Sequence, residues 1–279
     1  MPNAVLSPPR PDLPCRFFTT AKGVSRASRT SHQAPPVRVR LGDKIDYTIP
    51  ASATYGKPTE AIEYPEPLPA NGDRTPAPKS PINYRGTLVA NSNAPRVLTF
   101  ESSVERNAAL ILQTNRDIVE LLTQQPTCHF TDVYGIRHAH TFDFCARLRN
   151  GKRLGIAAKP IMKLIETNLV GTLLRIKQQG MNGLLDDVNF VTETFASDDA
   201  AHNAREILLS RRLRNVEEYQ AALEVVKGVR GPVRFRALFV GAEVPAHRRT
   251  ALWCLIDEGL LRPAAPGRID DTTLMIVTL

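Results

Sequence analysis

The sequence is poor in cysteine, and its few cysteines stand far apart. The 279 residues include 4 cysteines and no CxxC pair: Cys15, Cys128, Cys145 and Cys254. A zinc cluster needs closely spaced cysteines, and a disulfide framework is typical of small secreted domains, so both are excluded. Reduced thiols in a cytosol are the expectation.

Long apolar runs are absent as well. No stretch approaches the roughly 18 consecutive apolar residues that a transmembrane helix needs. The N-terminal sequence MPNAVLSPPRPDLPC carries prolines where a signal peptide has an apolar helix. We therefore expect a cytoplasmic protein without a membrane partner.

Proline is scarce after residue 95, because most of the 22 prolines precede it. Proline lacks an N–H group and fixes φ, so segments such as SPPRPDLP cannot form regular helices or central strands. We expect residues 1–84 to be a basic, largely disordered segment. Its basic cluster from Arg26 to Arg40 either contacts nucleic-acid phosphates or is a solvated tail.

The chain is basic overall, with a formal net charge of +8 and a pI of about 9.5. This excess suits a polyanionic partner such as nucleic acid, although it says nothing about the fold.

From about residue 96 the pattern alternates between helices and strands. Ser102 or Ser103 suits the N-cap of a helix that ends near Thr114. Further elements are expected as follows: strands in CHFTDVYG, HTFDFCARL and RLGIAAK, a helix of about 18 residues in IMKLIETNLVGTLLRIKQQG, a strand in DDVNFVTETF, and one or two helices over 198–228. The order predicts an α/β core over residues 85–197 with an antiparallel hairpin inside it, then a helical connector over 198–232.

The last segment, residues 233–279, has its own pattern. A helix from Pro245 to Glu258 ends at Gly259, and two short strands follow. This arrangement resembles a winged helix, so we expect a DNA-binding or partner-binding domain. Three basic residues at the helix start either meet phosphates or an acidic partner, or are solvated: His247, Arg248 and Arg249.

The stretch TFDFCARLRNGKRLGIAAKP, residues 141–160, reads as a β-hairpin. Alternation places Asp143 on one face of the first strand, and Ala157 and Lys159 on the matching face of the second. A two-residue turn would mix apolar and polar faces, whereas a three-residue loop with left-handed Gly151 keeps them matched. We therefore expect Asp143 and Lys159 to emerge together on one polar face, an arrangement that a structural ion pair would also produce.

An acid and a lysine in this position suit phosphodiester hydrolysis. The reaction needs a metal ion to activate water and stabilise charge, and Mg²⁺ prefers carboxylate ligands. A nearby lysine can orient the water or hold a phosphate. The preceding helix offers two further acids, Glu101 and Glu105, and we favour Glu105 because it lies one turn into the helix. The predicted catalytic set is Glu105, Asp143 and Lys159, with Glu105 and Asp143 as metal ligands.

Two smaller features have ordinary interpretations. His138 and His140 are spaced to share a strand face, but no third zinc ligand is near, so a solvated or DNA-facing pair is expected. The helix after the last core strand is basic, which is typical of a solvated or a DNA-facing surface: Arg205, Arg211, Arg212 and Arg214.

The motifs, in this order, resemble the TnsA-type transposon endonucleases of the restriction-endonuclease-like superfamily. Ser102–Glu105 matches the Ser-x-x-Glu helix, and Gln124–Pro126 matches a Gln-Pro segment. Asp143 matches the acidic strand, and Lys159–Pro160 matches the end of the Glu/Gln-x-Lys strand. The resemblance covers about residues 85–275 and implies a restriction-endonuclease-like core with a C-terminal winged-helix-like domain.

The resemblance also implies a function. Members cut the non-transferred strand at the 5′ ends of a mobile element with Mg²⁺, for which Mn²⁺ is an alternative. They act in the bacterial cytoplasm, at the nucleoid, with a DDE transposase that cuts the 3′ ends and with an AAA+ ATPase regulator.

The sequence departs from the family pattern at Ala157, where the family has glutamate or glutamine two residues before the lysine. Alanine offers only its backbone carbonyl as a ligand, although two carboxylates, a carbonyl, waters and a phosphate can satisfy Mg²⁺. The alternative is a catalytically impaired subunit that binds DNA or partners as an assembly module. A stand-alone restriction or repair nuclease is a third hypothesis.

Overall fold

The computed structural model describes residues 66–74, 84–90 and 95–279. The described residues from Pro67 onward belong to one compact unit. The predicted disordered segment, residues 1–84, lies mostly outside the described residues, as does its basic cluster from Arg26 to Arg40.

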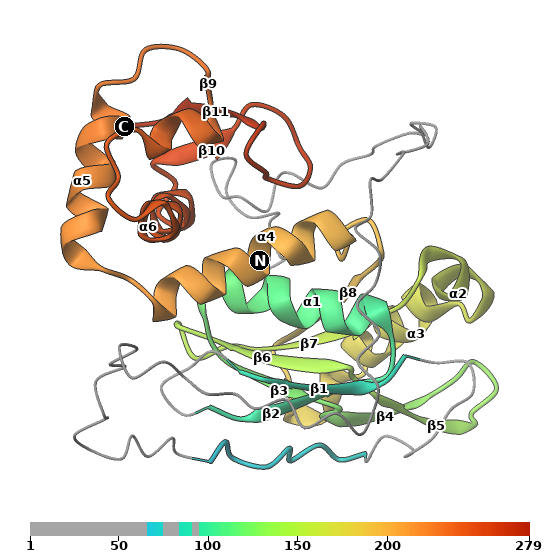
Figure 1. Cartoon of the computed structure of the whole chain (residues 1–279). Helices are drawn as coiled ribbons and strands as arrows, with labels where there is room; N and C mark the ends of the chain where they lie inside the picture. Colours follow the sequence, from blue (N-terminus) through green and yellow to red (C-terminus); the bar gives the residue numbers. More distant parts are fainter. Residues whose placement is uncertain (1–65, 75–83, 91–94) are drawn as a thin grey trace, which may run out of the picture. The chain divides into compact units, whose positions relative to one another are not determined.

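A four-stranded mixed sheet forms the core of the part of this unit that precedes the C-terminal elements (Figure 1). Its strands, in spatial order, are β3 (Ile118–Thr123), β6 (Phe144–Leu148), β7 (Arg153–Ala158) and β8 (Asp187–Val191). The first three are antiparallel neighbours, and β8 runs parallel to β7. The sequence did not lead us to expect β3, because IVELLT follows directly on the first helix and lacks strict alternation.

Helices cover both faces of the sheet. One face packs against α1 (Ser103–Thr114), which in turn packs against α4 (Asp198–Arg212). The opposite face packs against α2 (Ile161–Glu166) and α3 (Leu169–Gln178). Figure 1 shows α1 and α4 side by side over the sheet. The predicted α/β fold with a helix-flanked mixed sheet is confirmed.

The helix predicted over residues 161–180 is two helices instead of one. The chain turns at Asn168, whose φ of 47° is left-handed, a conformation that asparagine tolerates better than most residues. Leu164 before the turn and Leu169 after it are both buried in the same apolar cluster. The break lets both short helices cover the same face of the sheet.

The strand predicted in HTFDFCARL is also broken. The ribbon β4 (Thr127–Thr131) and β5 (Arg137–Thr141) continues the strands β3 and β6, but its register is offset by one residue. Gln124–Pro126 therefore lies opposite only Phe142 and Asp143, which is a β-bulge. The bulge turns Phe142 toward the apolar cluster of α3, while Phe144 faces that of α1.

The N-terminal described residues border the sheet at this bulge. The ribbon β1 (Gly86–Val89) and β2 (Val97–Phe100) approaches β3, where Thr99 N donates to Thr123 Oγ1 at 3.1 Å. Residues 66–74 belong to the sequence segment expected to be disordered, yet Asp73 N donates to Gln124 O at 2.9 Å. Asp73 Oδ2 in turn accepts from Thr127 N at 2.7 Å. These contacts place residues 66–74 beside the bulge.

The C-terminal elements surround a second apolar cluster that contains Trp253 and Phe235. Its elements are α5 (Val216–Lys227), β9 (Val233–Arg234), the 3₁₀ helix η3 (Phe235–Phe239), α6 (Pro245–Asp257), β10 (Leu261–Pro263) and β11 (Leu274–Val277). The three strands form an antiparallel sheet in the order β10-β11-β9. Helix α6 begins at the predicted residue, and Gly259 has the left-handed φ of 76° expected after its end.

The buried carboxylate of Asp257 connects these C-terminal elements to the part of the chain that contains the four-stranded sheet. Its carboxylate accepts from Arg211 Nη2 at 2.7 Å and from Arg116 Nη2 at 2.8 Å. Arg211 lies in α4 and Arg116 precedes β3, so one carboxylate joins α6, α4 and the α1–β3 connection. No helix among the described residues has the length and apolar character needed to cross a membrane.

Candidate active site

The hairpin of β6 and β7 has the register expected from the sequence. Phe144 pairs with Ile156, and the loop has three residues, with Gly151 at a φ of 84°. This register brings Asp143 beside the end of β7. Asp143 Oδ2 accepts from Ala158 N at 2.8 Å and lies 3.7 Å from Lys159 Nζ. Asp143 is buried and Lys159 is partly exposed.

The strand face to which alternation assigned Asp143 is apolar at Cys145 and Ala157, which the sequence did not predict. Cys145 and Ala157 are buried among Leu164 and Leu173 of the neighbouring helices. Strand β7 is buried on both faces, as expected of a strand that pairs in parallel under helices. The methyl group of Ala157 is therefore part of the apolar packing, and position 157 supplies no polar side chain.

Glu105 is fixed at the start of α1 by a capping box. Ser102 Oγ accepts from Glu105 N at 3.1 Å and donates to Glu105 Oε1 at 3.0 Å. Glu105 Oε2 accepts from Glu101 N at 2.8 Å. These bonds satisfy N–H groups that a helix start leaves unpaired, so the Ser-x-x-Glu pattern also has a structural cause.

The three predicted residues form one electrostatic cluster. Burial and, second, the charge of Asp143 raise the pKa of Glu105 to about 7 in total, against the lowering effects of the Glu101 N–H and Lys159. Burial also raises the pKa of Asp143, against the lowering effects of Lys159 and the Ala158 N–H. Two buried carboxylates that repel each other beside one lysine are typical of a functional site.

Arg74 is a member of this cluster that sequence reasoning missed. Its Nε and Nη2 donate to Gln124 Oε1 at 3.0 and 2.7 Å, and Nη2 also pairs with Glu101. Its charge lowers the pKa of Asp143. Because Arg74 lies in a segment that reads as disordered, no local sequence signal marks it. Glu101, the alternative acid, is taken up in ion pairs with Arg74 and Arg85.

Gln124 lies at the bulge and has an unusual environment. Its φ is 56°, a left-handed conformation that is costly for a residue with a long side chain. Gln124 N donates to Asp143 O at 3.0 Å, and its side chain is fully buried. The side-chain oxygen is bound by Arg74, whereas Nε2 has no hydrogen-bond partner among the described residues.

The two histidines of β5 differ in exposure, so they are not the solvated pair that was one of the two expectations, whereas a DNA-facing role stays a prediction. His138 is exposed and binds Asp132 Oδ2 at 2.9 Å. His140 packs edge-on against Phe142, with the ring centroids 4.9 Å apart. Burial and, second, the charge of Lys159 lower the pKa of His140 to about 4 in total, so its imidazole is neutral at pH 7. Its Nε2 is buried and has no hydrogen-bond partner within the described part of the chain.

The fit to a metal ion rests on two carboxylates. Among the described residues, no group of three or more histidine, cysteine, aspartate or glutamate side chains is arranged to hold a metal. Glu105 and Asp143 nevertheless suit a hard divalent cation, because Mg²⁺ commonly binds through one or two carboxylates and keeps several waters.

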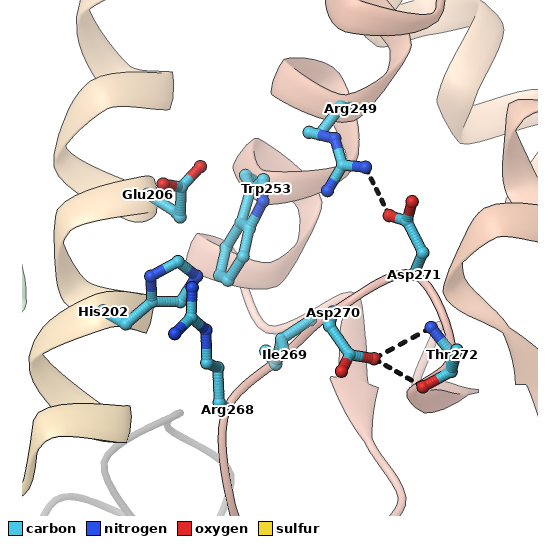
Figure 2. Close-up of a pocket in the computed structure, with 9 residues that line it drawn as sticks. All are labelled: His202, Glu206, Arg249, Trp253, Arg268, Ile269, Asp270, Asp271 and Thr272. Carbon is cyan, nitrogen blue, oxygen red and sulfur yellow. Dashed lines mark hydrogen bonds and ion pairs between the residues drawn. The ribbon is translucent and has the colours of Figure 1, made fainter. Parts of the chain in front are cut away.

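A cavity of about 410 Å³ lies among α4, α6 and the loop before β11 (Figure 2). Its charges are mixed: Arg249 pairs with Asp271, and Asp270 accepts hydrogen bonds from Thr272. Arg248 is buried and pairs with Glu218. Both expectations for Arg248, contact with phosphates or an acidic partner and a solvated helix start, are therefore wrong. The cavity is the weaker candidate for catalysis because Arg249 and Asp271 pair with each other.

The basic residues of α4 also have structural partners. Arg211 of α4 binds Asp257, and Arg214, which follows the end of α4, donates from Nη1 to Glu258 Oε1 at 2.6 Å. Neither needs a nucleic acid to account for its position. No protein-family model matches this sequence, and no curated protein matches it either.

Proposed function

We propose that the chain is a Mg²⁺-dependent DNA endonuclease subunit of a heteromeric transposase that cuts the 5′, non-transferred strand at transposon ends. The observation that carries the proposal is the cluster of Glu105, Asp143 and Lys159, built from α1 and the β6–β7 hairpin. A carboxylate pair with a lysine is the donor set that metal-assisted phosphodiester hydrolysis uses.

The order of elements supports a restriction-endonuclease-like core. Helix α1, the antiparallel strands β3, β6 and β7, the helices α2 and α3, and the parallel strand β8 follow the helix-strand-strand-strand-helix-strand order of that fold. The positions of Asp143 and Lys159 also support this core, because the two residues lie at adjoining ends of neighbouring strands.

The C-terminal elements support a winged-helix-like domain that binds a partner. The sequence α5, β9, η3, α6, β10 and β11 with the sheet order β10-β11-β9 follows the winged-helix order. Winged-helix domains that recognise DNA insert a helix into the major groove. Residues 251–257 of α6 are all buried, so only the first turns of this helix, where residues 245–247 are exposed, are available to face a groove. We assign this part to contact with the transposase or an AAA+ ATPase regulator.

Each residue of the site has a role in the proposed reaction. Glu105 and Asp143 would hold the metal, which when bound supplies Lewis acidity for water activation and charge stabilisation. The Ala158 N–H and Lys159 keep the Asp143 carboxylate in place. Lys159, with its partly exposed amine, orients the attacking water or holds a phosphate oxygen.

A second function is favoured by the packing of Ala157. Because its methyl group fills the apolar cluster and the capping box alone accounts for Glu105, the chain also fits a nuclease-like assembly module that binds DNA and partners without cutting. On this alternative, Asp143→Ala leaves element excision intact.

A nicking assay on a labelled transposon end separates these functions. The protein is tested with Mg²⁺ or Mn²⁺, with and without the cognate transposase, beside Asp143→Ala and Lys159→Ala. The endonuclease proposal expects 5′-strand nicks that both variants lose. If excision does not depend on Asp143, the endonuclease proposal is contradicted and the assembly module is supported. If nicking needs no transposase, a stand-alone nuclease is supported.

A further inference from the structure

The candidate site contains buried polar atoms that nothing in the described protein satisfies. Gln124 Nε2 and His140 Nε2 are buried side-chain nitrogens without a hydrogen-bond partner. Both belong to the segments that border Asp143: Gln124 binds the Asp143 carbonyl through its backbone, and His140 precedes Asp143 by three residues on β5.

An unpaired buried donor is costly, because the group loses its hydrogen bonds to water and gains none in return. Native proteins therefore keep few such groups, and each calls for an explanation. At His140 an apolar side chain of similar size would pack against Phe142 without that cost. An unpaired amide N–H at Gln124 and an unpaired imidazole nitrogen at His140, which donates in the Nε2–H tautomer, indicate a ligand that supplies the missing acceptors.

The surroundings hold Gln124 in a defined position. Arg74 fixes its side-chain oxygen with two hydrogen bonds, which orients the amide and leaves Nε2 as the unused donor. The left-handed backbone of Gln124 is a local strain, and such strain is typically found at functional sites. The strain and the fixed orientation both fit a residue that is held ready for a ligand.

His140 is suited to donate without carrying charge. Its ring is fixed against Phe142, and Lys159 lies near enough to disfavour a second positive charge on the imidazole. A neutral imidazole with its proton on Nε2 presents one N–H donor. Ala157 contributes no polar side chain, so these two neutral groups supplement the charged residues of the site.

We propose that Gln124 Nε2–H and His140 Nε2–H donate hydrogen bonds to the non-bridging oxygens of a DNA phosphodiester and position it against Asp143 and Lys159. This inference rests on the proposed endonuclease function and adds the groups that bind its substrate. Such bonds are strengthened by the negative charge of the phosphate.

The test compares two variants with two matched controls. His140→Phe and Gln124→Met remove the donors at similar size, and Arg74 keeps its ion pair with Glu101. His138→Phe and Gln125→Met change the same residue types two positions and one position away, where the side chains bind Asp132 and Asn71 instead. His140→Gln restores a side-chain N–H.

We expect His140→Phe and Gln124→Met each to lower kcat/KM for nicking of a transposon-end duplex at least tenfold, with both controls within about twofold of the wild type. We expect His140→Gln to recover part of the activity. The melting temperature of His140→Phe should be unchanged or higher, because an unpaired buried group is replaced by an apolar one.

The outcomes separate this inference from the endonuclease proposal. If the wild type nicks and both variants nick equally well, the donors have no role and the inference is overturned while the endonuclease stands. A fall in melting temperature with unchanged nicking overturns it too, as it indicates a structural role. If the wild type does not nick, the affinities of the wild type and the two variants for the same duplex are compared in Ca²⁺. Weaker binding by both variants than by the wild type supports the inference, and equal binding overturns it.

Discussion

Asp143 and Asp257 are both buried carboxylates, but their partners differ. Asp257 forms a bidentate ion pair with Arg211 and accepts a further hydrogen bond from Arg116, so its charge is compensated within the fold. Asp143 accepts one backbone N–H, lies 3.7 Å from a partly exposed lysine and faces the repulsion of Glu105. A fully paired buried charge holds elements together, whereas an incompletely paired one has capacity left for a ligand.

Replacing each acid in turn gives the largest expected effects and tests this contrast. Asp143→Asn should reduce nicking at least about 1000-fold, because it weakens a metal ligand that supplies several kcal/mol to the reaction. Its free energy of unfolding at pH 8 should be unchanged or higher, since burial disfavours the Asp143 charge. Nicking rates and urea denaturation measure the two quantities on the same preparation.

Asp257→Asn should show the opposite behaviour. It leaves Arg211 and Arg116 without their counter-charge, so the free energy of unfolding should fall by about 3 kcal/mol. Nicking per folded molecule should remain near the wild-type value in conditions where the variant is folded. The contrast between the two acids breaks down if Asp257→Asn is as stable as the wild type.

The pH dependence of stability should report Glu105. Its pKa is raised from 4.5 in the unfolded chain to about 7 in the fold, so the folded state binds the proton more tightly. Stability contributed by this group is present at low pH and is lost as pH rises toward and through 7, by up to about 3 kcal/mol. Glu105→Gln keeps a side chain that suits the capping box and should remove this slope in urea titrations from pH 5 to 8. An unchanged slope would contradict the assignment.

The hairpin loop gives the smallest effect. Gly151 has a φ of 84°, so Gly151→Ala should cost about 1 to 2 kcal/mol through its left-handed backbone. Lys152→Ala in the same exposed loop is the control and should stay within about 0.5 kcal/mol of the wild type. Thermal unfolding of both variants makes the comparison, and equal melting temperatures would argue against a left-handed residue at 151.

Local patterns predicted the parts of the fold that local chemistry determines. The cap at Ser102, the end of α6 near Gly259 and the three-residue loop at Gly151 follow from capping residues and strand alternation. The bulge at Gln124 and the break at Asn168 were not predicted, because both depend on which sheet face a distant helix covers.

In the candidate site too, the features set by local sequence could be predicted, whereas the features set by contacts between distant segments could not. Asp143 and Lys159 could be paired from the sequence because they lie on one hairpin, and Glu105 because it follows a capping serine. Arg74 and the burial of His140 could not, since they depend on contacts between segments far apart in the chain. The apolar face around Ala157 was missed because alternation does not show that a strand is buried on both sides.

The central claim is that Glu105 and Asp143 form a divalent-cation site, and binding of Mn²⁺ to the whole protein at pH 8 tests it most directly. Titration followed by electron paramagnetic resonance should show one bound ion in the wild type, with affinity that decreases below pH 7 as Glu105 takes up its proton. Glu105→Gln and Asp143→Asn should each weaken this binding at least about tenfold. Equal binding by the wild type and both variants, or no binding by any of them, would contradict the claim.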